Sequence, residues 1–174
     1  MQNYLHPIDG SLILAIGQNA TKSGRTDGLM ISLFDVSNFA NPTRVREYVE
    51  DSSASSSDAQ YDHRAFRYLP ESKLLILPLN INSWATKESF DGFVVYDVDE
   101  SEPFSKKFNI SHFDGAKGCW SRKHLSSRSM TFNGDVMTLK GHKVLSHSLE
   151  DESYKWELNL DANQSKEPSC YPWF

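Results

Sequence analysis

Long apolar runs and a leader pattern are both missing from the sequence. No stretch approaches the roughly 20 apolar residues that a membrane span needs. Residues 1–10 carry neither the basic nor the apolar region of a signal peptide. We therefore expect no membrane span. If the parent protein is secreted or otherwise extracytoplasmic, its signal peptide lies outside this chain.

Positive charge is in deficit as well. The chain of 174 residues has 18 Lys and Arg against 23 Asp and Glu, a formal net charge of −5 at pH 7. Binders of nucleic acid or of anionic membranes need a positive surface that displaces counterions. The composition therefore argues against a nucleic-acid partner. Its hydrophobic share of 39% and charged share of 24% are ordinary for a globular domain.

Recognisable catalytic motifs are absent too. The sequence has no GxSxG elbow for a nucleophilic serine, no glycine-rich phosphate loop followed by a helix, and no DxDxDG calcium loop. His142 and His147 are five residues apart, an offset that puts two side chains on opposite faces of a strand and hinders a shared ion. We expect no catalytic residues and no cofactor. Acidic side chains leave calcium as a weak alternative, at Asp97, Asp99 and Glu100 or at Asp58 and Asp62.

Only two cysteines occur, and they fit neither a zinc-binding spacing nor a CxxC redox pair. Cys119 precedes Trp120, and Cys170 begins the sequence CYPW, so each lies in an aromatic-flanked loop. A disulfide between them and two free thiols both remain open on this evidence.

What the sequence does contain is a repeat. The segment Gly28–Val36, GLMISLFDV, returns as Gly92–Val98, GFVVYDV, with Phe34 and Tyr96 62 residues apart. Both segments place apolar side chains on both faces of an extended strand, so both faces must be covered. A strand in a β-propeller blade meets this requirement, because its sheet is sandwiched between neighbouring blades. A buried strand of an α/β sheet is the alternative, but no long helical pattern separates the two segments.

Three copies of a four-stranded unit account for most of the chain. Each copy opens with a short strand, a turn and an apolar strand; in the third copy the turn is Asn133-Gly134, the strongest short hairpin signal. A third strand follows, and then a fourth whose alternation leaves one face polar, as suits the outer edge of a blade. The sequence thus predicts an all-β fold of about three antiparallel propeller blades that belong to a larger propeller. The expected bounds are about 1–51 for blade 1, 60–112 for blade 2 and 128–162 for blade 3, with fourth strands from Thr43, Phe104 and Ser153 and a C-terminal tail at 163–174.

Links and single polar residues allow more local predictions. Residues 51–58, DSSASSSD, are expected to form a solvated connector, and residues 113–127 an ordered loop that could carry function. Asp35 and Asp97 are each expected to cap the turn after their strand. His63 is interpreted as a structural histidine with a local hydrogen bond.

Five segments together resemble a known family. They are LHPIDGSLILAIGQNAT from Leu5, GLMISLFDVSNFANPTRV from Gly28, DHRAFRYLPESKLLILPL from Asp62, FDGFVVYDVD from Phe90 and RSMTFNGDVMTL from Arg128. In this combination the chain resembles secreted proteins that carry a C-terminal β-propeller domain distantly related to WD-type repeats. The resemblance implies an extracytoplasmic propeller without agreed catalytic residues.

The resemblance bears on the cysteines, on glycosylation and on partners. A secreted family favours a Cys119–Cys170 disulfide, which would close the last blade. Secretion also agrees with three glycosylation sequons, at Asn19, Asn109 and Asn163. Three blades are fewer than the roughly four to eight that close a propeller. The remaining blades of the parent chain, or a partner chain, are therefore expected to complete the ring.

Two expectations follow for the packing of the blades. Phe34 and Tyr96 should occupy equivalent, buried positions between blades. The terminal blades should each leave one face uncovered, and these faces should be apolar rather than charged. The residues expected on them are Leu14, Ile16, Leu33 and Val94.

The leading functional hypothesis is a non-enzymatic extracellular scaffold that binds a protein, a glycan or a surface partner through its loops. A hydrolase or metal-dependent enzyme with a site in the central channel is the first alternative. A structural subunit of a larger assembly is the second, recognisable by large apolar patches. Inward-facing acidic and histidine side chains would favour the enzyme, and a lining of apolar and hydroxyl groups the scaffold.

Overall fold

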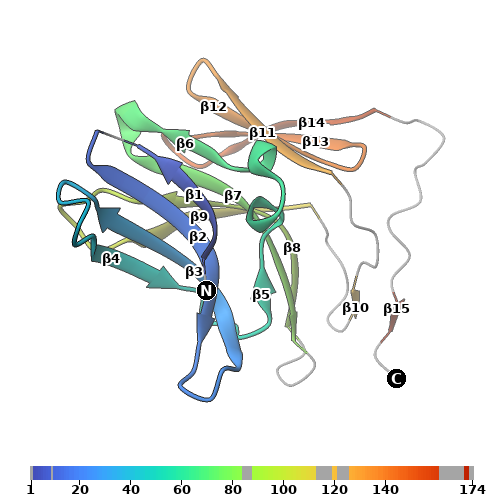
Figure 1. Cartoon of the computed structure of the whole chain (residues 1–174). Coiled ribbons are helices and arrows are strands. Elements are labelled where there is room, and N and C mark those ends of the chain that lie inside the picture. Colours follow the sequence, from blue (N-terminus) through green and yellow to red (C-terminus); the bar gives the residue numbers. More distant parts are fainter. Residues whose placement is uncertain are drawn as a thin grey trace.

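The computed structural model describes residues 2–8, 10–83, 88–112, 119–120, 126–160 and 171–172. Within these ranges it contains β-strands and three short 3-10 helices but no α-helix. Three antiparallel sheets lie one after another, with their faces packed together (Figure 1). The predicted all-β fold with three blade-like sheets is confirmed. No helix in the described ranges has the length and apolarity to cross a membrane.

Blade 1 is a meander in which each strand pairs with the one before it. Gly28, near the start of β3, lies where the backbone of blade 1 is crowded. It has a φ of +90°, and a Cβ there would lie 2.8 Å from the carbonyl oxygen of Glu50 and 2.9 Å from that of Ser52. Glycine is therefore required at this position of β3, because the segment by which the chain leaves blade 1 passes against it. The strands are β1 (Gln2–Pro7), β2 (Leu12–Ala20), β3 (Thr26–Asp35) and β4 (Thr43–Val49).

Blade 2 follows the same plan, except that its first strand is split into two pieces. β5 and β6 both pair with β7, β5 near one end and β6 near the other. The 3-10 helices η1 (Asp58–Gln60) and η2 (His63–Ala65) fill the gap between the two pieces. The remaining elements are β5 (Ser55–Ser56), β6 (Arg67–Leu69), η3 (Pro70–Ser72), β7 (Leu74–Ser83), β8 (Glu88–Asp97) and β9 (Ser105–Ser111).

The link between blades 1 and 2 is therefore not the solvated connector that was expected for residues 51–58. Ser55 and Ser57 are each 3% exposed. The Ser55 hydroxyl accepts a hydrogen bond from the Leu29 amide at 2.7 Å, and Ser57 forms a capping box with Gln60. Serine side chains here satisfy buried backbone groups, which composition alone does not reveal.

Blade 3 is a regular four-stranded meander. Its first hairpin turns at Asn133 and Gly134, which have φ values of 50° and 80°, as a type I′ turn requires. A separate two-stranded sheet pairs β10 (Cys119–Trp120) with β15 (Tyr171–Pro172). The blade 3 strands are β11 (Ser127–Phe132), β12 (Asp135–Lys140), β13 (Lys143–Ser148) and β14 (Tyr154–Asn159).

The segments that carry the two cysteines are adjacent where the structure describes them, because the backbone of Cys119 pairs with that of Pro172. Cys170 itself lies outside the described residues, so the expected disulfide stays a prediction. Most of the expected ordered loop at 113–127 is outside the described ranges as well.

Two hydrophobic cores hold the three sheets together. Leu75, Leu77 and Leu79 of β7 point into the core shared with blade 1, and Leu74 and Ile76 of the same strand point into the core shared with blade 3. Both faces of blade 2 are thus covered, as the apolar composition of its strands predicted. The two cores together bury most of the large aliphatic residues of β2, β3, β7 and β8.

The three blades are equivalent in detail, because each carries a β-bulge at the same place between its third and fourth strands. This alignment makes Phe34, Tyr96 and His147 equivalent, as predicted for the first two. Tyr96 is fully buried, whereas Phe34 is only half-buried, so the prediction of equal burial is wrong. The bulges lie between Leu33 and Phe34, between Val95 and Tyr96, and between Ser146 and His147.

Tyr96 and Phe34 differ in burial because of the side of the sheet on which their side chains lie. Tyr96 belongs to the core between blades 1 and 2, and the tilted ring of His147 lies 6.5 Å from that of Phe108 of blade 2, so this side of each blade faces the preceding blade. We call it the leading face and the opposite side the trailing face. No blade precedes blade 1 within residues 1–174, and Phe34 on its leading face is partly exposed there.

The prediction of which residues lie on the uncovered faces was wrong. Leu14, Ile16, Leu33 and Val94 all have 0% exposure and lie in the core between blades 1 and 2. The uncovered faces are instead the leading face of blade 1 and the trailing face of blade 3. The trailing face of blade 3 carries Arg128, Asp135 and Ser146 beside apolar residues, which are Met130, Phe132, Met137, Leu139, Val144, Trp156 and Leu158.

Candidate functional site

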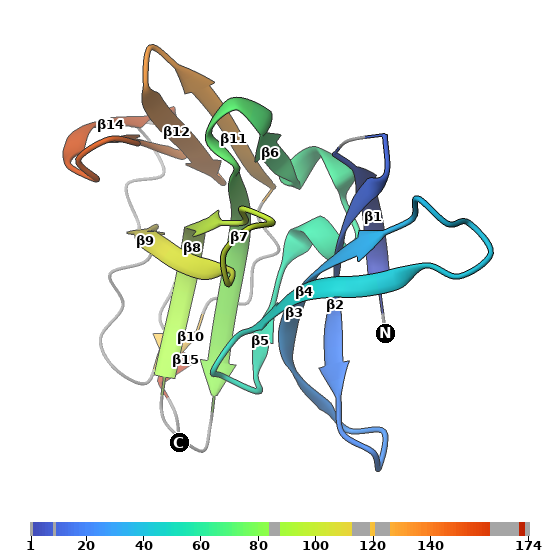
Figure 2. The same cartoon turned by 90° about the vertical axis from the view of Figure 1, so that its left-hand side faces the viewer.

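The first strands of the blades come together along one side of the molecule, which we call the inner edge. β1, the segment from η1 to η2, and β11 form it, and the outer strands β4, β9 and β14 lie on the opposite side (Figures 1 and 2). η1 contacts β1 and β2, and η2 contacts β11, so the helices of blade 2 connect both neighbouring blades. In a propeller, this is the side that faces the central channel.

Two carboxylates suggested from the sequence lie at the inner edge, and both are engaged. Asp58 accepts a hydrogen bond from the Ser127 hydroxyl of blade 3 at 2.5 Å. Asp62 forms ion pairs with Arg64 at 3.0 Å and with Arg128 of blade 3 at 2.9 Å. Its hydrogen bond from Arg64, together with the nearby Arg128 charge, lowers the pKa of Asp62 to about 2. Both side chains therefore link blade 2 to blade 3 instead of standing ready as metal ligands.

Neutral polar groups line the part of the inner edge next to blade 1. The Gln60 side-chain oxygen accepts from the Ser57 amide at 3.0 Å and from the Gln18 side chain at 3.3 Å, while its nitrogen donates to Asn3 at 3.4 Å. Burial of the Gln60 side chain is compensated by these hydrogen bonds. Blade 1 is thereby fixed to η1 by amide groups and carries no charge there.

The histidines of the inner edge do different things from those expected. The His63 ring is exposed and makes no hydrogen bond to the described residues; the local cap of η2 is Asp62, which accepts from the Arg64 amide at 3.1 Å. His6, which the sequence did not single out, packs on Phe66 with ring centroids 4.6 Å apart, and its burial lowers its pKa. The His6 Nδ1 atom also lies 3.2 Å from the Tyr4 hydroxyl.

The blade turns gather at one end of the molecule, which we call the hairpin end, on the left in Figure 1. It comprises the turns at 36–42, 70–73, 98–104, 133–134 and 149–153. Carboxylates close several of these turns, and two of them, Asp35 and Asp97, were predicted from the sequence. Asp35 accepts from the Ser37 amide at 2.8 Å, Asp97 from the Asp99 amide at 3.2 Å, and Asp151 from the Ser153 amide at 3.2 Å.

The carboxylates considered for calcium are occupied in the same way. Asp99 accepts from the Ser101 amide and hydroxyl at 2.8 and 2.7 Å, and Glu100 pairs with Lys73 at 3.0 Å. Within the described ranges, no three His, Cys, Asp or Glu side chains are grouped so that they could hold a metal ion. The arrangement stabilises turns through acidic side chains.

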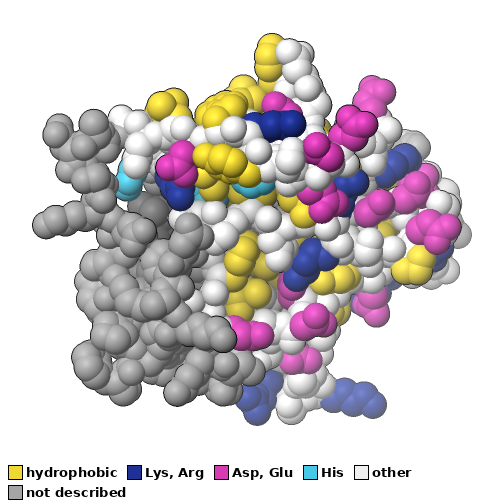
Figure 3. All heavy atoms as spheres, turned by 180° about the vertical axis from the view of Figure 1, so that it is seen from behind, with side chains coloured by type: hydrophobic (Ala, Val, Ile, Leu, Met, Phe, Trp, Pro, Cys, Tyr) yellow, Lys and Arg dark blue, Asp and Glu magenta, His cyan; other side chains and the backbone are white. Residues whose placement is uncertain are grey.

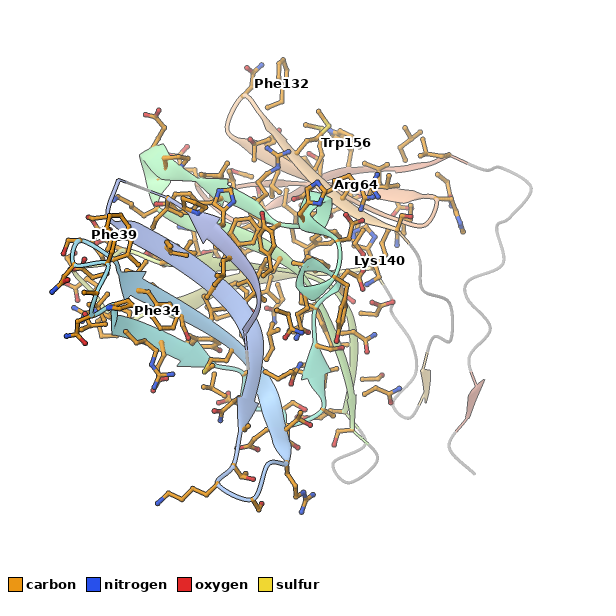
Figure 4. All side chains as sticks on the ribbon, in the orientation of Figure 1. Phe34, Phe39, Arg64, Phe132, Lys140 and Trp156 are labelled. Carbon is orange, nitrogen blue, oxygen red and sulfur yellow. The ribbon has the colours of Figure 1, made fainter. Side chains whose placement is uncertain are left out.

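The hairpin end also exposes an aromatic side chain on an ordered turn. Phe39 is 84% exposed, and it lies at the far side of blade 1 in Figure 4. Asn38 holds this turn, since its side chain accepts from the Ala40 amide at 3.1 Å and its carbonyl accepts from the Asn41 amide at 3.0 Å. A large apolar group is thus presented to solvent by a fixed backbone.

Polar groups buried between blades are the feature that the sequence did not predict. Glu50, 3% exposed, ends blade 1 and reaches blade 2, where Tyr96 and Lys106 bind its two carboxylate oxygens at 2.5 and 2.9 Å. Between blades 2 and 3, Lys140 forms a buried ion pair with Asp91. The only signal in the sequence was the placement of charged residues at the ends of apolar strands.

Two of the three glycosylation sequons fall in described strands. Asn19 lies half-buried in β2 and Asn109 lies exposed in β9, whereas Asn163 is outside the described residues. Asn109 is therefore the sequon best placed for modification among the two that are described.

Comparison with known proteins bears on the fold and not on a ligand. Comparison with curated proteins finds no match. A family model described as a β-propeller domain matches residues 1–152, which include the sheets of blades 1 and 2 and the first three strands of blade 3. With three equivalent blades packed face to face and a family model that covers most of its length, the chain belongs to the β-propeller domain family.

Proposed function

We propose that this chain is part of a non-enzymatic extracellular β-propeller scaffold that binds a partner through the turns of its hairpin end. The observation that carries the proposal is Phe39, 84% exposed on a turn that Asp35 and Asn38 hold by hydrogen bonds. A preorganised aromatic loses little conformational entropy on binding, and aromatic side chains dominate the energy of protein interfaces.

The charge of the hairpin end favours a basic protein or peptide among the possible partners. The described turns of blades 2 and 3 carry an excess of carboxylates, with Lys73 as the basic residue among them. Electrostatic complementarity raises association rates and excludes partners of like charge. Anionic glycans and anionic surfaces are accordingly less favoured than a cationic protein surface. The carboxylates concerned are Glu71, Asp99, Glu100, Glu102, Glu150, Asp151 and Glu152.

An array of basic peptides and an array of neutral and anionic glycans, probed with the labelled chain, test this proposal. We expect the chain to bind basic peptides, and Phe39→Ser to weaken that binding at least tenfold. Tyr61→Ser is the matched control, because Tyr61 is 83% exposed but lies between η1 and η2 at the inner edge. Equal losses in both variants, or binding confined to anionic glycans, would contradict the proposal.

The enzymatic alternative requires a separate assay. Chromogenic esters, phosphoesters and glycosides are offered to the chain with and without added calcium or zinc. We expect no turnover above that of a heat-denatured sample. Turnover that is lost in Asp62→Asn or His63→Gln would place catalysis at the inner edge and would overturn the scaffold proposal.

The extracellular part of the proposal is supported by the family resemblance, by the pair of cysteines and by the exposed sequon at Asn109. Expression behind a eukaryotic secretion signal tests it. We expect the secreted product to lose mass on endoglycosidase treatment and Asn109→Gln to abolish most of that loss. Retention of the chain inside the cell as misfolded protein would count against an extracellular role.

A further inference from the structure

Blade 2 departs from the repeat at the inner edge, and the departure is confined to one segment. The first strands of blades 1 and 3, β1 and β11, are single strands of six residues each. In blade 2 the equivalent strand is divided into β5 and β6, and η1 and η2 lie between the two pieces. Irregular segments on a regular scaffold are where binding groups are usually placed. The η1–η2 segment is therefore the part of the inner edge where a binding site is expected.

This segment is anchored on one side and open on the other. Ala59 of η1 and Ala65 of η2 are fully buried and belong to the core between blades 1 and 2. In contrast, Tyr61 is 83% exposed, and the side chain of Arg64 is 66% exposed. His63 is exposed as well, and Figure 4 shows Arg64 beside η2, near blade 3. The packing of the blades does not account for these large exposed side chains.

The guanidinium group of Arg64 is held in one orientation by its neighbour in η2. Its Nε atom donates to Asp62 Oδ1 at 3.0 Å, and its Nη2 atom donates to Asp62 Oδ2 at 3.4 Å. This two-pronged contact uses the nitrogens on one edge of the planar group. The Nη1 atom makes no hydrogen bond to the described residues, so its two hydrogens remain available to a ligand.

A second arginine, from blade 3, reaches the same carboxylate. The Arg128 Nη2 atom lies 2.9 Å from Asp62 Oδ2, and its Nη1 atom donates to the Ser127 carbonyl at 2.6 Å. Its Nε atom has no partner within the described ranges. Two guanidinium groups thus share one carboxylate, which fixes both of them and neutralises only one of the two positive charges.

The junction of blades 2 and 3 at the inner edge is positively charged in a chain that is acidic as a whole. It contains three arginines and two aspartates, whereas the chain has a net charge of −5. Arg67 donates its Nε hydrogen to a backbone carbonyl of β11 at 2.8 Å, so no carboxylate of the described residues neutralises it. Acidic side chains gather instead at the hairpin end, on the right of Figure 3. The charge of the junction favours an anionic ligand. Its charged residues are Asp58, Asp62, Arg64, Arg67 and Arg128.

We propose that this junction binds an oxyanion, namely a carboxylate or phosphate group of a ligand in the central channel. The Nη1 group of Arg64 and the Nε group of Arg128 donate hydrogen bonds to it, because planar guanidinium groups match the oxygens of both kinds of anion. Asp62 already orients the two arginines, so the ligand does not have to order them when it binds. The site lies apart from the turns of the hairpin end and selects a ligand of the opposite charge.

Saturation-transfer NMR on the full-length protein tests the proposal with acetate and methyl phosphate, two probes whose methyl protons report binding. Sodium chloride keeps the ionic strength constant, because salt screens exposed charges. We expect saturable binding with a dissociation constant in the millimolar range, since the carboxylate of Asp62 opposes part of the attraction. The probe that binds more tightly identifies whether the site prefers a carboxylate or a phosphate group.

Variants of one arginine separate this site from general attraction to charge. Arg64→Gln should weaken binding of the probes about tenfold, the effect of losing a hydrogen bond to a charged group. Arg64→Lys keeps the charge without the planar group and should give an intermediate loss. Arg25→Gln is the matched control, because Arg25 is exposed on the turn between β2 and β3, and Phe39→Ser at the hairpin end should likewise leave binding unchanged. Binding that does not saturate, or equal losses in Arg64→Gln and Arg25→Gln, would show that these arginines only join the blades and would overturn the proposal.

Discussion

Tyr96 of blade 2 donates a hydrogen bond to Glu50 of blade 1 at 2.5 Å across an interface whose other contacts are largely apolar. Lys106 neutralises the same carboxylate at 2.9 Å. A carboxylate that is 3% exposed is tolerated there because both of its oxygens are bound. The pair fixes how the end of one blade meets the next.

Tyr96→Phe is predicted to lower the free energy of unfolding by about 1.5 to 3 kcal/mol, the typical loss for a hydrogen bond to a charged group. Urea unfolding followed by fluorescence measures the change. Tyr154→Phe provides the control, since Tyr154 is 55% exposed and its loss should cost less than about 0.5 kcal/mol. Equal effects would mean that the Glu50 contact contributes no stability.

The same contact predicts a loss of stability in alkali. Burial and the Glu50 charge raise the pKa of Tyr96 well above the ordinary value of 10.0. Above pH 10 an unfolded tyrosine releases its proton while Tyr96 in the folded chain keeps it, so stability falls as pH rises. We expect the wild type to lose stability between pH 10 and 11 more steeply than Tyr96→Phe does. Parallel curves would exclude this explanation.

His112 predicts a loss of stability in weak acid. Burial lowers the pKa of His112 to about 3, and the charges of Lys140 and Lys143 act in the same direction. The unfolded chain binds this proton near pH 6.5 and the folded chain only near pH 3. Stability should therefore fall by about 1.4 kcal/mol for each pH unit below 6.5.

Unfolding measured from pH 6.5 to 4.5 checks this, and His112→Gln should show a flatter slope. Protonation of Asp62 and Asp151 does not affect stability in this pH range. Their pKa values are lowered from the ordinary 3.8 to about 2, so both groups change stability only at lower pH. His63→Gln, on an exposed ring, should keep the wild-type slope. A wild-type slope in His112→Gln would refute the assignment.

The disulfide between Cys119 and Cys170 remains a prediction, now supported by the pairing of Cys119 with Pro172. Closing a loop of about fifty residues contributes roughly 4 kcal/mol in the chain-entropy model. Intact-mass spectrometry after alkylation without reductant tests it on protein produced in an oxidising compartment. We expect no label before reduction and two labels after it; two labels on the folded, unreduced protein would disprove the bond.

Gly92 in β8 should not accept a side chain. A Cβ at this position would clash with the carbonyl oxygen of Ile110 on the neighbouring strand. Gly92→Ala must push β8 and β9 apart, so we expect a loss of about 1 to 3 kcal/mol in urea unfolding. Gly10→Ala is the control, because nothing lies within 4 Å of a Cβ there. A neutral Gly92→Ala would show that the strands separate freely.

The repeat made the fold predictable, because residues such as Leu75 and Ile76 need cover on both faces of a strand and only a stack of sheets supplies it for three copies. Turn chemistry was equally readable: Asp35, Asp97 and Asn133 act locally, and their neighbours in sequence are their partners in space. Local interactions of this kind leave a direct trace in sequence.

Contacts between blades left no such trace. Glu50 binds Tyr96, 46 residues away, and Asp58 binds Ser127, 69 residues away. A serine-rich link read as solvated proved to be buried because its hydroxyls serve the Leu29 amide and η1. Which face of a terminal blade stays open depended on the direction of packing, and an apolar residue such as Phe34 does not reveal that direction by itself.

The bulge repeated in all three blades has a consequence for how the protein can aggregate. It leaves one unpaired residue in each outer strand, namely Val45 in β4, Lys107 in β9 and Lys155 in β14, and all three are exposed. An interrupted, largely lysine-bearing rim is a poor template for an added strand. Amyloid-like growth by strand addition along the rim is thereby disfavoured. Association through the open apolar faces of the sheets is not blocked in this way.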